Sequence, residues 1–171
     1  MNSEEFRSKQ APLKAQYKEQ PQTALVVLKA EGALGAGISC RVDTGKAVIE
    51  AGLHPATGGT GLQACSGNML LDALVACAGV TLQAVATALG IEIQSGRVRA
   101  EGELDFRGTL GVSKEAPVGF KRIRLIIDVA TTATEEQKAN LLRLTERYCV
   151  VLQTLKQSPI VESTLTSSSS V

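Results

Sequence analysis

The stretch CSGNMLLDALVACAGVTLQAVATALG, residues 65–90, decides the fold of this 171-residue chain. It consists mostly of small and aliphatic residues, with Ser66 as a candidate helix N-cap and Gly90 at the position that commonly follows a helix. At 3.6 residues per turn, one side of this helix collects Leu70, Leu74, Cys77, Thr81 and Val85. We therefore expect a long helix over residues 66–89 with an apolar, buried side.

The segments around this helix predict strands and a second helix. Residues 38–43 and 46–51 flank Thr44-Gly45, which is typical of a hairpin. Residues 97–106 alternate between charged and apolar side chains, and residues 121–130 predict another long strand. A capping-box pattern at Thr134-Glu-Glu-Gln137 begins a helix that is expected to reach about residue 156, and a short strand is expected over residues 159–165. Separate strands and helices in this order favour an α+β fold with antiparallel sheets and two long central helices.

Three regions follow from this pattern. Residues 1–23 form an N-terminal helical extension, with the helix expected over residues 3–19; residues 24–165 form the main domain; and residues 166–171 are a polar C-terminal tail. The extension could cover a dimer or a pocket, and the sequence does not choose between the two.

Composition excludes several classes of function. Eighteen Lys and Arg against 17 Asp and Glu leave a net charge of +1, and aromatic residues make up 3% of the chain, which argues against nucleic-acid binding. The single histidine, His54, excludes an HExxH metal site. The cysteines at 40, 65, 77 and 149 form no CxxC pair, which argues against zinc. No metal and no cofactor are expected.

The compartment follows from the N-terminus and from the apolar segments. The first 20 residues are strongly charged and lack the apolar core of a signal peptide. Asp72 and Gln83 interrupt the longest apolar run, so no membrane span is expected. A cytoplasmic protein is the resulting expectation, and structural disulfides are rare there. The cysteines are then either core residues or reactive thiols.

The local context of each cysteine indicates whether it is more typical of a core residue or of a reactive thiol. Cys65 lies beside a helix N-terminus, where unpaired N–H groups stabilise a thiolate. Cys77 lies far along its helix, where the dipole of that helix gives little help, so a packing role is a strong alternative. Cys40 is expected in the core. Cys149 has Glu146 three residues earlier, and a neighbouring carboxylate raises a thiol pKa, which favours a resolving thiol over an attacking one.

Three segments together resemble the OsmC/Ohr superfamily, the osmotically inducible and organic hydroperoxide resistance proteins. They are the loop His54-Pro-Ala-Thr-Gly-Gly-Thr-Gly61, the helix Met69-Leu-Leu-Asp-Ala-Leu-Val-Ala-Cys77 and the helix Glu146-Arg-Tyr-Cys-Val150. The resemblance extends over about residues 24–165. It implies an intertwined homodimer with sites at the subunit interface.

The same resemblance implies a thiol-dependent peroxidase. Cys77 matches the peroxidatic thiol, which attacks an organic hydroperoxide and becomes a sulfenic acid, and Cys149 matches the resolving thiol. A dithiol reductant would regenerate the enzyme. The family holds its thiolate with an arginine on an early strand, and Arg41 is the one arginine between residues 8 and 96.

The sequence departs from the family pattern at two positions. Gly67 stands where the family has a Glu that orients the arginine, and Val150 replaces the Pro that follows the resolving cysteine. Asp72 could supply a carboxylate, but on a helix it points about 140° away from Cys77. Cys65 lies near the position of the family Glu and could be an alternative resolving thiol.

These departures leave two other interpretations open. One is a non-enzymatic dimer that binds a small apolar ligand at its interface, with the cysteines as packing residues. The other is a thiol redox sensor that is oxidised at Cys77 without sustained turnover.

Overall fold

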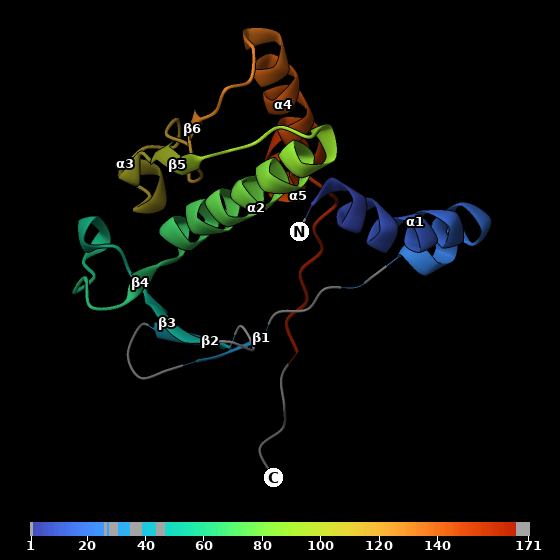
Figure 1. Ribbon diagram of the computed structural model, residues 1–171. Coiled ribbons are helices and arrows are strands. Elements are labelled where there is room, and N and C mark those ends of the chain that lie inside the picture. Colours follow the sequence, from blue (N-terminus) through green and yellow to red (C-terminus); the bar gives the residue numbers. More distant parts are fainter. Residues whose placement is uncertain (1, 26, 28–30, 35–38, 44–46, 167–171) are drawn as a thin grey trace.

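A single long helix organises the molecule. The computed structural model describes residues 2–25, 27, 31–34, 39–43 and 47–166, with 9, 21, 31–34 and 39–43 described by their backbone alone. Helix α2 (Ser66–Leu89) has 24 residues, and the other elements pack along it or at its ends (Figure 1). The sequence therefore correctly predicted the helix that decides the fold.

The ends and the buried side of α2 differ in detail from the expectation. Gly90 follows the helix in the left-handed conformation, with φ 70°, as predicted. The N-cap residue is Cys65 and not Ser66, because the backbone at Cys65 is still extended, and its side chain caps no N–H group. The fully buried stripe repeats every four residues, at Leu74, Ala78, Leu82 and Ala86. The predicted stripe at 77, 81 and 85 lies along its border and is half-buried.

Two long strands cover one side of α2. Strands β5 (Ser95–Glu103) and β6 (Arg122–Ala130) pair antiparallel, with Val98 opposite Ile127 and Gly102 opposite Ile123. The short helix α3 (Phe106–Thr109) follows β5, which ends earlier than predicted because Asp105 caps that helix. The other side of the β5–β6 sheet is charged, with ion pairs such as Arg99–Asp128 at 2.8 Å. A solvated sheet face, as the alternating charges predicted, is confirmed.

A second sheet lies near the start of α2. It contains β1 (Glu31–Leu34), β2 (Ser39–Asp43), β3 (Val48–Gly52) and β4 (Ala64–Cys65) in that order. The predicted hairpin is confirmed as β2–β3, whereas β4 pairs with β3 in parallel. Between β3 and β4 the chain makes the 3-10 turn η2 (Pro55–Thr57). Strand β4 leads directly into α2 and so fixes where that helix begins (Figure 1).

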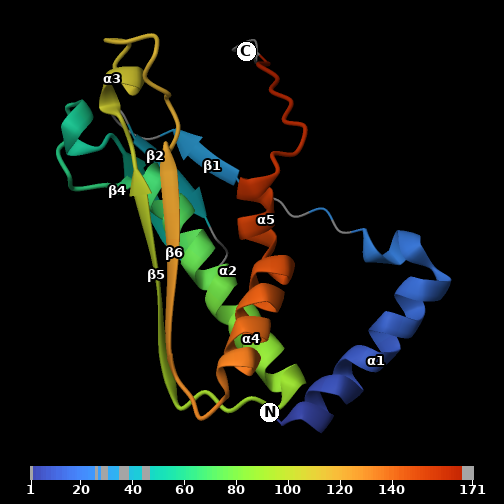
Figure 2. The same ribbon diagram turned by 90° about the horizontal axis from the view of Figure 1, so that it is seen from above.

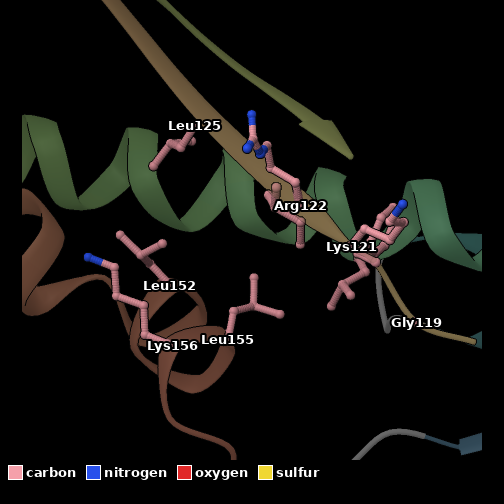
Figure 3. Close-up of a pocket in the computed structure, with 10 residues that line it drawn as sticks. Gly119, Lys121, Arg122, Leu125, Leu152, Leu155 and Lys156 are labelled. Atoms are coloured by element: carbon pink, nitrogen blue, oxygen red, sulfur yellow. The ribbon is translucent and has the colours of Figure 1, made fainter. Parts of the chain in front are cut away.

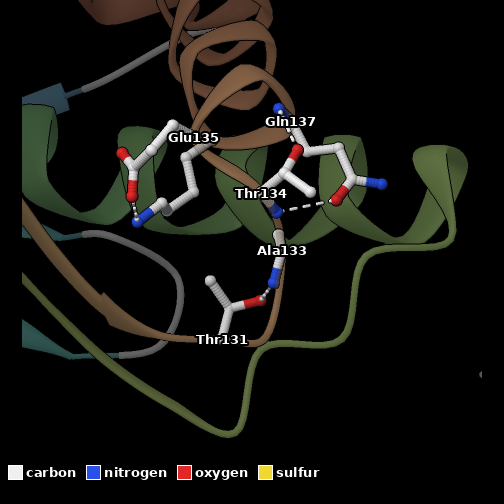
Figure 4. A network of polar contacts seen from close by, with 6 residues as sticks. Thr131, Ala133, Thr134, Glu135 and Gln137 are labelled. Carbon is white, nitrogen blue, oxygen red and sulfur yellow. Dashed lines mark hydrogen bonds and ion pairs between the residues drawn. The ribbon is translucent and has the colours of Figure 1, made fainter.

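The second predicted helix is two helices. Helix α4 (Glu135–Tyr148) begins with the expected capping box, in which the Thr134 Oγ1 accepts from the Gln137 N–H at 3.2 Å and the Thr134 N–H donates to the Gln137 Oε1 at 2.9 Å (Figure 4). The chain leaves the helical conformation at Cys149, with φ −72° and ψ 104°, and α5 (Val150–Lys156) follows. The expectation of one helix reaching residue 156 is wrong, and of the two expected long central helices only α2 has that length.

Helices α4 and α5 run antiparallel to α2 and complete the core. Leu141 of α4 packs with Leu82 and Ala86 near the end of α2. Cys149 packs with Leu74 and Ala78, nearer to its start. Figure 2 shows α4, α5 and the β5–β6 pair running alongside α2. The buried core therefore lies where these elements meet, and the break at Cys149 is part of it.

The two terminal segments extend away from this core. Helix α1 (Ser3–Glu19) has the predicted bounds, and its Arg7 Nη2 donates to the carbonyl of Ala88 at the end of α2, at 3.1 Å. The 3-10 turn η1 (Pro21–Ala24) follows. Residues 159–165 form no strand, which corrects the prediction: their apolar side chains are exposed, and they pair with no strand among the described residues. A strand needs a partner edge, and sequence alone does not supply one.

Candidate active site

The middle of α2 places one thiol against the core. Cys77 is half-buried and packs against the cluster formed by Leu74, Ala78 and Cys149. Val98 and Ala100 of β5, with Ile123 and Leu125 of β6, pack against the same cluster. Cys77 is thus a half-buried cysteine with apolar surroundings.

The break between α4 and α5 places the second thiol beside it. Cys149 is fully buried. Its N–H donates to the Thr145 carbonyl at 3.0 Å, in the last turn of α4, and its carbonyl accepts from the Gln153 N–H at 2.9 Å, in the first turn of α5. The Gln153 Nε2 also donates to the Glu146 carbonyl across the break, at 2.7 Å. These bonds fix the break, which leaves the first N–H groups of α5 without partners inside their own helix.

Those N–H groups lie at the sulfur of Cys77. Burial acts to raise the pKa of the Cys77 thiol, but the backbone N–H of Val151, the Cys149 thiol, the Thr81 hydroxyl and the N–H of Val150 together bring that pKa below its ordinary value. Unpaired N–H groups at a helix start stabilise an anion. The position of Cys77 within its own helix, on which the sequence prediction relied, therefore does not decide its charge, because the donors belong to α5.

The pKa of Cys149 moves in the opposite direction. Burial is the largest cause and raises the pKa of the Cys149 thiol; the N–H groups of Leu152 and Val151 oppose this, and contact with Cys77 raises the pKa further. Glu146 does not contribute to this shift, and its carboxylate pairs with the Lys156 Nζ at 3.1 Å. The expected direction is confirmed, but its expected cause is wrong. The site thus pairs one thiol that ionises readily with one that keeps its proton.

The structure places the remaining predicted residues in different surroundings. Asp72 lies on an exposed side of α2, as its spacing from Cys77 predicted. Arg41 lies on β2, with Glu50 opposite on β3, and Cys40 precedes it. The side chains of Arg41 and Cys40 fall outside the described part of the chain. The proposed contact between Arg41 and Cys77 therefore stays a prediction.

Cys65 belongs to a separate cavity at the start of α2. The cavity has a volume of about 390 Å³ and is mostly apolar, with Cys65, His54, Gly67, Phe106 and Phe120 in its wall. The rings of His54 and Phe106 stack with centroids 4.9 Å apart. A Cβ built on Gly67 would contact the Phe120 ring at 3.5 Å and the Cys65 Sγ at 3.6 Å. The structure thus brings Cys65 to Gly67, but it does not bring Cys65 to the Cys77–Cys149 pair.

An open apolar groove lies between β6 and α5. It has a volume of about 490 Å³. Leu125 of β6 lies on one side, with Leu152 and Leu155 of α5 on the other (Figure 3). Leu125, Leu152 and Leu155 also pack against the cluster that contains Cys149, so the groove adjoins the thiol pair.

Sequence reasoning missed the donors supplied by Val150, Val151 and Thr81. One signal was present: the family Pro that Val150 replaces has no N–H group and is favoured in the first turn of a helix. The family Pro at this position therefore indicates that a helix begins after Cys149, and that Cys149 does not lie inside a helix. Among the described residues, no three metal-ligating side chains come together.

A family model described as OsmC-like protein matches residues 59–164. The chain belongs to the OsmC-like family. The resemblance stated from the three sequence segments is therefore confirmed. The match includes both helices that carry the thiol pair, whereas α1 and strands β1–β3 lie before it.

Solved structures show the same fold. An OsmC-like protein from Mycoplasma pneumoniae is 16% identical, with a TM-score of 0.66, and the alignment covers 78% of this chain and 89% of that one. An organic hydroperoxide resistance protein from Elizabethkingia anophelis is also 16% identical, with a TM-score of 0.59 and coverage of 78% and 91%. A search of curated protein sequences finds no match. At these identities the neighbours of this OsmC-like protein establish its fold.

Proposed function

We propose that this OsmC-like protein is a thiol-dependent peroxidase that reduces organic hydroperoxides, with Cys77 as the peroxidatic thiol and Cys149 as the resolving thiol. One observation carries the proposal: the half-exposed Cys77 has a lowered pKa and contacts a buried cysteine whose pKa is raised. Two solved neighbours with the same fold, from Elizabethkingia anophelis and Legionella pneumophila, are described as organic hydroperoxide resistance proteins.

The reaction proceeds in two steps. The Cys77 thiolate attacks the terminal oxygen of the hydroperoxide, the O–O bond breaks, and the alcohol leaves after taking up a proton, with Cys77 as a sulfenic acid. The Cys149 sulfur then attacks the Cys77 sulfur, a disulfide forms, and the sulfenic oxygen leaves as water. A dithiol reduces this disulfide and is itself oxidised, so no metal or cofactor is needed.

The proposal includes a cytoplasmic homodimer. Support comes from α2, which exposes small and apolar side chains along the side turned away from the core, with Val80 73% exposed at its middle. Such a surface on a core helix favours coverage by a second copy of the chain. Arg41 is proposed as the cation that holds the Cys77 thiolate.

The test is consumption of cumene hydroperoxide with dithiothreitol as the dithiol. We expect turnover by the wild-type protein and a fall of about 100-fold or more for Cys77→Ser, because an alcohol does not replace a thiolate as nucleophile. Without dithiothreitol, one equivalent of hydroperoxide should leave Cys149→Ser with Cys77 as a sulfenic acid, which a dimedone adduct detected by mass spectrometry records.

Cys65→Ser is the matched control, since Cys65 lines a different cavity. It should retain wild-type turnover, and melting temperatures should show that all three variants fold. Equal turnover by wild type and Cys77→Ser would contradict the proposal.

Binding of a small apolar ligand is the second candidate function. The groove between β6 and α5 and the absence of a Glu at Gly67 favour it. If the protein is a ligand binder, Cys77→Ser does not alter its binding function, and an apolar fluorescent probe binds the wild-type protein and the variant with equal affinity. Oxidation of Cys77 by a single equivalent of hydroperoxide, without turnover in the presence of dithiothreitol, would instead identify a redox sensor.

A further inference from the structure

Thr81 lies one helical turn after Cys77 on α2 and is half-buried. Side chains four residues apart on a helix are neighbours on one face, so the Thr81 hydroxyl and the Cys77 sulfur lie on the same side of α2. Both residues lie on the half-buried border of α2, next to the core cluster that contains Cys149. Thr81 is therefore placed to act on the sulfur from within the same helix.

The hydroxyl of Thr81 differs from that of a second threonine on the same helix. A threonine inside a helix commonly donates its hydroxyl to the carbonyl four residues earlier. Thr87 does so, with its Oγ1 2.8 Å from the Gln83 carbonyl oxygen. Among the described contacts, Thr81 makes no such bond, and its hydroxyl lies close enough to the Cys77 sulfur to lower the pKa of that thiol. One helix thus holds two threonines: the hydroxyl of Thr87 is bonded to the backbone, whereas that of Thr81 is free of such a bond and lies on the side of Cys77.

We propose that Thr81 is a catalytic residue, whose hydroxyl donates a hydrogen bond to the Cys77 sulfur and favours its thiolate form. The inference rests on the thiol chemistry proposed above. Before the reaction, the hydroxyl and the N–H groups at the start of α5 together stabilise the negative charge on the Cys77 sulfur. Thr81 differs from them because it is a side chain, so a substitution removes it without changing the backbone.

The surroundings of Cys77 limit the other sources of a pH effect. From β5 and β6, the residues that pack against the cluster are Val98, Ala100, Ile123 and Leu125, none of which titrates. Among the described residues that contact Cys77, Cys149 at the α4–α5 break is the one titratable group. A change in the titration of Cys77 after substitution at Thr81 therefore reports on the hydroxyl, provided that Cys149 is unchanged.

The experiment measures how fast iodoacetamide alkylates Cys77 from acidic to alkaline pH, in reduced protein without hydroperoxide, by mass spectrometry of the peptide. Thr81→Val keeps the shape of the side chain and removes its hydroxyl. We expect alkylation at neutral pH to slow by about 3- to 10-fold, which corresponds to the loss of one ordinary hydrogen bond. The midpoint should move to higher pH, and at alkaline pH the rates should converge, because Cys77 is then ionised in both proteins.

Three further variants make the result decisive. Thr81→Ser keeps a hydroxyl and should restore the wild-type profile, Thr81→Ala serves if the valine variant does not fold, and Thr87→Val controls for loss of a threonine from α2. The proposal is overturned if both Thr81→Val and Thr81→Ala keep the wild-type profile, or if Thr87→Val shifts it equally. The alkylation experiment contains no peroxide, so its result is independent of the cumene hydroperoxide assay. A shifted alkylation profile without peroxide turnover supports the role of Thr81 and contradicts the peroxidase. Peroxide turnover with an unshifted profile supports the peroxidase and contradicts the role of Thr81.

Discussion

Cys77 and Cys149 are the same chemical group, and the protein moves their pKa values apart by giving them different neighbours. Burial raises the pKa of both thiols. At Cys77 the N–H groups of α5, the Cys149 thiol and the Thr81 hydroxyl together outweigh it, whereas at Cys149 the N–H groups of α5 fall short. The folded state therefore favours the Cys77 thiolate. Its contribution to stability is complete above the ordinary thiol pKa and is lost as the pH falls through the folded pKa of Cys77.

Thr145 carries a second prediction at this scale. Its side chain is 1% exposed, and its Oγ1 has no hydrogen-bond partner among the described residues. A buried hydroxyl without a partner costs about 1–3 kcal/mol, and valine has the same shape without it. We therefore expect Thr145→Val to raise the free energy of unfolding of the reduced protein by about 1–2 kcal/mol, measured by urea denaturation.

The control is Thr154→Val on α5, where the threonine is exposed. A change within about 0.5 kcal/mol is expected there, because water already satisfies that hydroxyl. A loss of stability in Thr145→Val would show that the buried hydroxyl has a partner in solution.

From the sequence, two cysteines could be selected that the structure brings together, but not the groups that surround them. The resemblance selected Cys77 and Cys149, which the structure brings into contact. Local electrostatics had favoured Cys65, because a residue beside a helix start can be recognised along the chain. The N–H groups of Val150 and Val151 reach Cys77 from a different helix, and a contact of that kind is not encoded by spacing.

At the scale of elements, the break between α4 and α5 is the feature that makes the site. Its position is defined by Cys149, whose extended backbone matches the conformation that a residue preceding Pro prefers. Val150 is then the first residue of α5, where a missing N–H and a fixed φ are well tolerated.

Proline substitutions test this assignment. We expect Val150→Pro to change the free energy of unfolding by less than about 1 kcal/mol, because the restriction of the unfolded chain offsets the loss of the Val150 N–H beside Cys77. Val151→Pro is the contrast, since it would force the helical Val150 out of its conformation; it should destabilise by about 3 kcal/mol. Thermal and urea unfolding of both variants measure the difference, and equal destabilisation would place the break elsewhere.

Local signals decided which elements the sequence predicted well. The Gly90 terminus and the Thr134–Gln137 capping box depend on neighbouring residues only, and both are present in the structure. The chain around Cys149 contains neither Gly nor Pro, so its apolar pattern predicted one continuous helix. The expected strand at residues 159–165 likewise needed a partner, and strand propensity does not supply one.

At the scale of the molecule, α2 is strongly apolar, and little of it is buried against the described part of the chain. Its most apolar window has a mean hydropathy of 1.8 and is 22% buried. By length and composition this helix could cross a membrane, a test that core helices also pass. Its packing against β5, α4 and α5 is that of a core helix, and the proposed dimer would cover its open side.

A charge on that side should separate the copies. We expect the wild-type protein to be a dimer by size-exclusion chromatography with light scattering, and Val80→Glu to be a monomer, because burying an unpaired carboxylate is strongly unfavourable. Val112→Glu is the matched control: Val112 is 72% exposed, against 73% for Val80, but it lies in the loop after α3. A dimeric Val80→Glu or a monomeric wild type would contradict the assembly.

The contact between α2 and the α4–α5 break has a thermodynamic consequence for the proposed reaction. A bond between Cys77 and Cys149 closes a loop of about 70 residues, and in the chain-entropy model such a crosslink stabilises a fold by about 4 kcal/mol through the entropy of the unfolded chain. The oxidised protein would then resist unfolding more strongly than the reduced one. Each catalytic cycle would carry the molecule through a tightened and a relaxed state, so the supply of reductant would set its global stability as well as its rate.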